Sequence, residues 1–217
     1  MPTMLDLLPL AGYAAAMSVT PGPNNVMLTA SGVNFGYRRS LPHMLGIGLG
    51  CGVQTFLVAV GLGTLFARLP WLHTALQWGG AAYLVYLAIR VARAGEIGRT
   101  EGARPLTLIE GAAFQFVNPK AWVMAITTVA LFLPAGGPAW TAGLAISAVL
   151  MLVNFPCISV WTLFGVALSR LLSDARYRRA FNGAMALLLV ATAVLGLLDS
   201  PAPGADTALA PSTTRPL

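Results

Sequence analysis

Long runs without a charged residue are the feature of this sequence that most constrains its fold. Ala121–Ser169 hold no Asp, Glu, Lys or Arg over 49 positions, and Leu7–Tyr37 hold none over 31. Charged residues make up 9% of the chain, against about 25% in ordinary soluble domains. A helix crosses hydrocarbon in about 20 apolar residues, because its backbone hydrogen bonds are internal. The sequence therefore predicts an all-α integral membrane protein surrounded by the lipid bilayer.

The uncharged runs predict six transmembrane helices. The segment "PAGGP" provides a turn inside the longest run. The first run lacks the basic start of a signal peptide, so it is expected to be retained as a span. The spans are predicted at about 5–30, 41–66, 70–91, 107–133, 139–168 and 180–198.

Arginines are distributed unevenly among the predicted loops. Counted from the N-terminus, the odd loops hold ten arginines, and the even loops and the termini hold two. Because basic loops stay in the cytoplasm, both termini are predicted to be extracytoplasmic. The net charge of +6 is thus explained by orientation in a membrane, and no nucleic-acid partner is expected.

One polar segment divides the six spans into three and three. Residues 92–106 are predicted to be a cytoplasmic linker between half-repeats at about 1–91 and 107–199. Since three is odd, the halves would have opposite orientations, as in the inverted repeats of secondary transporters. Residues 1–199 then form one membrane domain, and residues 200–217 are expected to be a disordered extracytoplasmic tail.

The first span is interrupted near its middle by "TPGPNN". Pro21 and Pro23 remove two backbone donors, and Gly22 adds flexibility between them. Such a break is tolerated in a membrane only where protein or a water-filled cavity receives the freed groups. Asn24 and Asn25 add amides that donate and accept hydrogen bonds. The motif predicts a binding site for a polar solute or a gating hinge, and a simple proline kink is the alternative.

The fourth span carries a similar interruption, "FVNPKAW". Asn118 and Pro119 precede Lys120, a charge that is expensive at membrane depth unless it lines a pathway or is paired. Lys120 is predicted either to contact a substrate carboxylate or to extend to the cytoplasmic interface. In the fifth span, "NFP" places Pro156 at a third break or a kink.

Few residues could carry a proton. No Asp or Glu lies deep in a predicted span. The candidates are Glu110 and Asp6, with His43 as a third, and all three are expected near span ends, where interfacial charges are common.

The glycine-rich stretches "LGIGLGCG" and "VGLGTL" in the second span allow close helix packing, and they would permit a homodimer. Cys51 and Cys157 fall in corresponding spans of the two halves, without a CxxC or a Cys/His cluster. No metal site and no cofactor are therefore predicted.

Two of these motifs resemble those of a known family. "TPGPNNVMLTASGVNFGYRRS" and "FQFVNPKAWVMAITTVALFLP" are similar to the signatures of the LysE/RhtB family of bacterial amino-acid exporters. The resemblance covers nearly the whole chain apart from the tail. The matching positions are Pro21, Gly22, Pro23, Asn24, Asn118, Pro119 and Lys120.

The resemblance implies export of small amino acids or their derivatives across the bacterial cytoplasmic (inner) membrane by proton antiport. Alternating access around the interrupted helices would move the solute. Many members carry an acidic residue in the second span, where this chain reads "GIGLGCGVQT". This departure favours a neutral or sulfur-containing amino acid over a basic one.

Two other functions are alternatives to transport. A membrane thiol-redox carrier would use Cys51 and Cys157, one from each half. An integral membrane hydrolase lacks support, because the chain has no HExxH, no GxSxG and no paired carboxylates. A transporter, and not an enzyme, is predicted.

Overall fold

The structure is a computed structural model, and it describes residues 4–62, 68–94 and 104–198. These residues form helices joined by short turns, and none of them is in a β-strand. Among them, three helical stretches are long and apolar enough to cross a membrane, namely Tyr37–Leu62, Ala139–Leu171 and Ala175–Leu198. The all-helical prediction is therefore confirmed. The tail and most of the linker lie outside the described residues.

Both predicted helix interruptions are present. Helix α1 (Met4–Val19) ends where the prolines begin, and α2 (Pro23–Phe35) starts after Gly22. Helix α6 (Leu108–Val117) is followed directly by α7 (Pro119–Phe132). In each case a proline occupies the first turn of the second helix, where its missing N–H costs nothing.

The remaining helices are continuous over longer stretches. They are α3 (Tyr37–Leu57), which continues into the π-helical turn η1 (Val58–Leu62), α5 (Pro70–Ala94), α8 (Ala139–Leu171) and α9 (Ala175–Leu198). The prediction of a break at Pro156 is wrong, because α8 runs through it. A single proline removes one hydrogen bond, whereas "PGP" removes two and adds a glycine.

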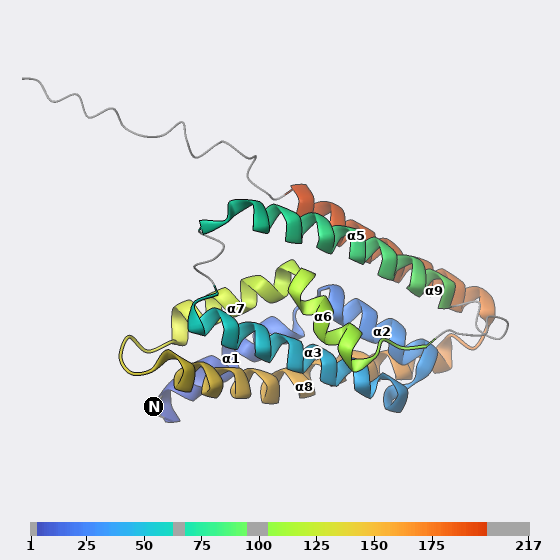
Figure 1. The fold of residues 1–217 in the computed structure, drawn as a ribbon. Helices are drawn as coiled ribbons and strands as arrows, with labels where there is room; N and C mark the ends of the chain where they lie inside the picture. The colour runs from blue at the N-terminus through green and yellow to red at the C-terminus, as the bar shows by residue number, and fades with distance from the viewer. Residues whose placement is uncertain (1–3, 63–67, 95–103, 199–217) are drawn as a thin grey trace, which may run out of the picture.

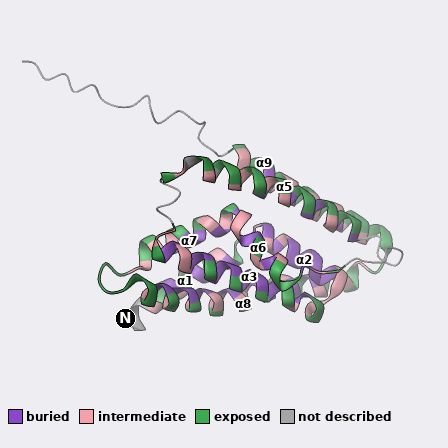
Figure 2. Ribbon diagram, in the orientation of Figure 1, coloured by how far each residue is buried: buried purple, intermediate pink, exposed green. Residues whose placement is uncertain are grey.

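The helices form a main body and a pair that packs beside it, against α2 and α6 (Figure 1). In the main body, α8 packs against α1 and α2, and α3 packs against α6 and α7. Each pair of helices separated by an interruption therefore packs on one long helix, α8 or α3. Helices α5 and α9 run antiparallel beside each other, and buried side chains are concentrated in the main body (Figures 1 and 2).

Glycines set the closest helix contacts. A Cβ on Gly32 of α2 would lie 2.2 Å from the carbonyl oxygen of Thr162 in α8. A Cβ on Gly165 of α8 would lie 2.2 Å from the carbonyl oxygen of Thr29 in α2. In α3, Gly46 approaches the Leu108 carbonyl in the same way. These small residues pack helices within one protomer, so they give no independent support to the predicted homodimer.

Replacing Gly32 by Ala is expected to lower the free energy of unfolding by about 1–3 kcal/mol, because α2 and α8 would have to separate. The measurement is the melting temperature of the detergent-solubilised protein. Gly12→Ala is the matched control, since a Cβ there meets nothing within 4 Å. Equal melting temperatures for the two variants would contradict the close approach of α2 and α8.

Candidate functional site

The end of α1 leaves carbonyl groups without helical donors, and side chains from elsewhere satisfy them. Asn25 Nδ2 donates to the carbonyl oxygens of Ser18 (3.0 Å) and Thr20 (2.8 Å). Trp161 Nε1, from α8, donates to the carbonyl oxygen of Val19 (3.2 Å). The break therefore persists because each freed acceptor has a substitute donor.

Lys120 of α7 reaches across to the same break. Its Nζ donates to the Thr20 carbonyl oxygen (2.5 Å), to Thr20 Oγ1 (2.9 Å) and to the Pro21 carbonyl oxygen (3.3 Å). A Cβ on Gly22 would lie 2.8 Å from Lys120 Cδ, so the glycine leaves room for the lysine stem. The ammonium group lies at the negative end of the α1 dipole, where a cation is favoured. The two interruptions are thus joined by Lys120.

Asn118 ends α6 and begins α7. Its Oδ1 accepts from the backbone N–H of Lys120 (3.2 Å), which is an N-cap interaction. Because Pro119 follows at the first helical position, the "NPK" sequence both stops one helix and starts the next.

Gln115, which is not among the predicted site residues, is at the centre of the hydrogen-bond network. Asn24 Nδ2 donates to Gln115 Oε1 (2.9 Å), and Gln115 Nε2 donates back to Asn24 Oδ1 (3.1 Å). The same Oε1 accepts from Asn118 Nδ2 (3.4 Å) and from Cys51 Sγ (3.5 Å). A glutamine between two phenylalanines in "FQFVN" is a signal that could have identified it.

Asn154 of α8 is a second residue that the sequence analysis missed as a site residue. Its Nδ2 donates to Ser18 Oγ (2.9 Å). Its Oδ1 is buried and has no hydrogen-bond partner among the described residues. The signal in the sequence is an amide inside an apolar run, two residues before Pro156.

A small cavity of about 30 Å³ lies where these residues meet. This volume holds about one water molecule and no amino acid. All four predicted binding residues line the cavity, as do two of the predicted helix breakers. Its polar and helix-breaking lining residues are Ser18, Gly22, Pro23, Asn24, Asn25, Asn118, Lys120 and Asn154.

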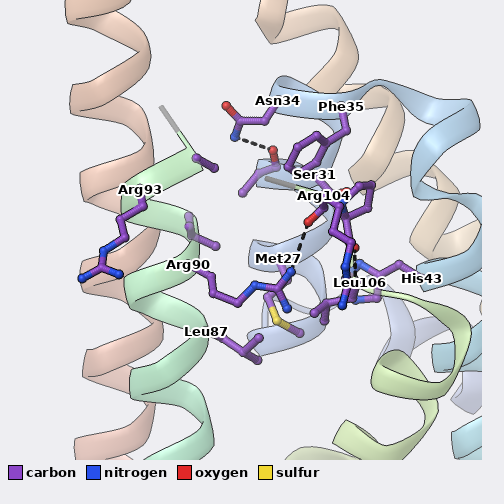
Figure 3. A pocket seen from close by; sticks show the side chains of 14 residues that line it. Met27, Ser31, Asn34, Phe35, His43, Leu87, Arg90, Arg93, Arg104 and Leu106 are labelled. Carbon is purple, nitrogen blue, oxygen red and sulfur yellow. Dashed lines mark hydrogen bonds between the residues drawn. The ribbon is translucent and has the colours of Figure 1, made fainter. Parts of the chain in front are cut away.

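A larger cavity of about 310 Å³ opens near the arginine-rich end of the molecule. In Figure 3 the Arg90 side chain extends from α5 into this space, whereas Arg93 points away from it. His43, Asn34 and Ser31 contribute further polar groups to the lining. Most of the remaining lining is apolar, including Met27, Leu87 and Leu106 (Figure 3).

A third cavity, of about 380 Å³, is lined by apolar residues at the other end of the interrupted helices. The three cavities follow one another along both chain segments. Along α1 and α2 they are lined by residues 7–10, then 17–25, then 27–35. Along the α6 and α7 segment the same cavities take residues 131–134, 118–124 and 104–106. The narrowest cavity therefore lies between two wider ones.

Glu110, a predicted proton carrier, is held in ion pairs. Its carboxylate contacts Arg104 at 2.6 Å and Arg90 at 3.4 Å, and it accepts from the Thr107 N–H at 2.7 Å in a capping box. Hydrogen bonding to this carboxylate raises the pKa of Arg104. The other predicted carrier, Asp6, falls in α1, but its side chain lies outside what the structure describes.

His43 differs from Glu110 because it is unpaired. The residue is 1% exposed and lines the 310 Å³ cavity. Neither ring nitrogen has a hydrogen-bond partner among the described residues. Glu110 and Arg90 are the charged groups that act on it electrostatically.

The two cysteines are free and differently placed. Cys51 is buried and lines the central cavity, whereas Cys157 is half-buried on α8 and does not line it. The thiol-redox function stays a prediction that these positions do not test. Within the described parts of the chain, no group of three His, Cys, Asp or Glu residues could hold a metal ion.

Interrupted helices that enclose a polar centre, within an apolar helical protein, are typical of membrane proteins that bind a polar solute. Comparison with known proteins identifies the family. The LysE type translocator model matches residues 15–200, and the chain belongs to this family.

Curated relatives resemble most of the chain. It is 31% identical over 182 residues to the cysteine/O-acetylserine efflux proteins of Escherichia coli (strain K12) and Shigella flexneri. The match covers 84% of this chain and 92% of each relative. The protein of the same name from Escherichia coli O6:K15:H31 is 30% identical over the same length. No solved structure matches the chain.

Replacing Gln115 by Leu is expected to lower the free energy of unfolding by about 1–3 kcal/mol, because the part-buried Asn24 amide loses both partners. Thermal unfolding in detergent measures the change. Cys51→Ser serves as the control, since a serine hydroxyl still donates to Gln115, and it should change stability by less than about 1 kcal/mol. If the Leu variant is as stable as the Ser variant, the amide pair does not stabilise the centre.

Proposed function

We propose that this protein is a secondary exporter of small neutral or sulfur-containing amino acids. It moves them from the cytoplasm across the bacterial inner membrane by alternating access. Membership in a translocator family supports amino-acid export, and the named efflux relatives support cysteine or O-acetylserine as first substrates to test.

The observation that carries this proposal is the sequence of cavities along the two interrupted helices. In alternating access, a central binding site opens to one side of the membrane at a time. Here a narrow centre of about 30 Å³ holds polar side chains, and a wider cavity lies on each side of it. Opening the centre toward either end would give the alternating access that transport requires.

The site residues have complementary roles in this proposal. Lys120 contacts the substrate carboxylate, aided by the N-termini of α2 and α7, which favour anions. Asn24, Asn25 and Asn118 orient the rest of the solute through their amides. Pro21, Gly22, Pro23 and Pro119 keep the helices interrupted and allow the two sides to move.

The packing supports an inverted repeat with six spans. Helices α1 and α2 pack on α8, α6 and α7 pack on α3, and α5 pairs with α9, as expected for two halves with the same order of helices. With the arginine distribution, this arrangement supports a cytoplasmic position for the 310 Å³ cavity and extracytoplasmic termini. A homodimer stays a prediction.

Export is proposed to be coupled to proton entry. Two arginines neutralise Glu110, and its side chain caps the N-terminus of α6. These contacts suit a structural role for Glu110. His43 has no such partner and borders the cytoplasmic cavity, so among the three candidates it is best placed to bind and release a proton.

Expression in bacteria fed with mixed dipeptides is expected to release one or a few amino acids into the medium. Cysteine or O-acetylserine should be prominent among them, measured by mass spectrometry. Lys120→Ala should abolish the release, because Lys120 is the sole lysine of the chain and no other ammonium group is available at the break.

Gly12→Ala, on the exposed side of α1, is the control and should export normally. The amount of each variant in the membrane is determined in parallel. Release that continues unchanged in Lys120→Ala would contradict the proposed site, and a release profile identical to that of cells lacking the protein would contradict export of amino acids.

The proposed proton coupling predicts a specific loss in His43→Asn. Inside-out vesicles with an acidic interior should accumulate the exported amino acid when they contain the wild-type protein. His43→Asn should lose the response to the pH gradient and retain exchange of labelled for unlabelled substrate, whereas Glu110→Gln should retain both. A His43→Asn protein that still responds to the gradient would assign the proton to another group.

A further inference from the structure

We propose that the carbonyl end of α1 is the seat for the substrate's α-ammonium group, and that Lys120 occupies this seat when no substrate is bound. The inference rests on the proposed function, because it names the part of the amino acid that the site binds there. The substrate must then carry a free, protonated amino group beside its carboxylate.

The chemistry of the seat is that of a cation site. Three oxygen atoms, the two carbonyl oxygens of Thr20 and Pro21 and the Thr20 hydroxyl oxygen, accept from one ammonium group. The Thr20 hydroxyl donates a hydrogen bond to the Met17 carbonyl oxygen (2.9 Å), so its oxygen accepts from the cation through a lone pair. The partial negative charge at the C-terminus of α1 adds to this preference.

A second observation points to the same ligand. Asn154 Oδ1 is buried, lines the central cavity with Lys120, and has no partner among the described residues. In this orientation Nδ2 donates to Ser18 Oγ, and Oδ1 is the atom left without a donor in the described part of the chain. A buried acceptor without a donor is costly, and an ammonium group supplies the missing proton.

Exchange of one ammonium group for another keeps the charge balanced. When the substrate's ammonium enters the seat, Lys120 leaves it and pairs with the carboxylate of the same molecule. The site then gains a zwitterion of zero net charge, and no acceptor at the end of α1 is left unpaired. The long, flexible lysine stem, which crosses Gly22 without a side chain in the way, makes this movement sterically simple.

The seat is tested by removing the Lys120 ammonium group and adding a small ammonium ion that can bind in its place. In purified Lys120→Ala, methylammonium chloride is expected to raise the melting temperature by about 2–4 °C or more. Potassium chloride at equal ionic strength should not do so. The wild-type protein, whose seat is filled, should respond much less to methylammonium. Equal effects of the two salts on the variant would overturn the proposal.

A second pair of variants keeps the lysine and so avoids dependence on one substitution. Thr20→Val removes the hydroxyl acceptor at nearly constant shape, and Thr20→Ser retains it. In vesicles the Val variant should raise the half-saturating concentration of L-cysteine about tenfold or more, and the Ser variant should stay near wild type. N-acetyl-L-cysteine, whose amino group carries no charge, should not compete with L-cysteine. Competition by this blocked compound would exclude an ammonium seat.

The outcomes separate this inference from the proposed function. If export occurs and depends on Lys120, but methylammonium does not stabilise Lys120→Ala, the exporter stands and the seat is wrong. If methylammonium stabilises the variant but no amino acid is exported, the seat stands and the solute is a different cation.

Discussion

A helix interrupted inside a membrane leaves carbonyl groups that must find donors in the protein, and the centre of this molecule is organised around that requirement. The carbonyl oxygens from Ser18 to Pro21 receive donors from Asn25, Trp161 and Lys120, which belong to three different helices. Each unsatisfied group in hydrocarbon would cost several kcal/mol. The break is therefore stable only when α2, α7 and α8 are in place. The local backbone conformation thus depends on the packing of the whole main body.

The same requirement gives the centre its polarity. Four half-helix ends meet there: the C-termini of α1 and α6 carry partial negative charge, and the N-termini of α2 and α7 carry partial positive charge. A zwitterionic solute matches this arrangement of opposite charges over a short distance. The Asn24 and Gln115 amides pair with each other, so these donors and acceptors are satisfied by the protein itself.

Sequence patterns predicted the helical class, the two interruptions and the residues beside them, because prolines and charge-free runs act locally. They also placed Lys120 at the centre. They did not reveal Gln115 or Asn154, whose importance comes from partners 91 and 136 residues away in the chain. At Pro156 the local signal predicted a break that is absent. Helix α8 stays helical through this proline because it packs along its length against α2 and α3.

The wide and narrow parts of the interior have different physical requirements. In the 310 Å³ cavity, Arg90 and Arg104 form ion pairs with a carboxylate of the protein itself, so their positive charge is partly compensated. The centre has no acidic residue, and its single cation is bound by neutral oxygen atoms. Neutral acceptors bind an ammonium group less strongly than a carboxylate would, so the substrate's own ammonium is able to replace Lys120 and later leave. A weak, exchangeable cation site at a narrow centre is what repeated loading and release by an exporter requires.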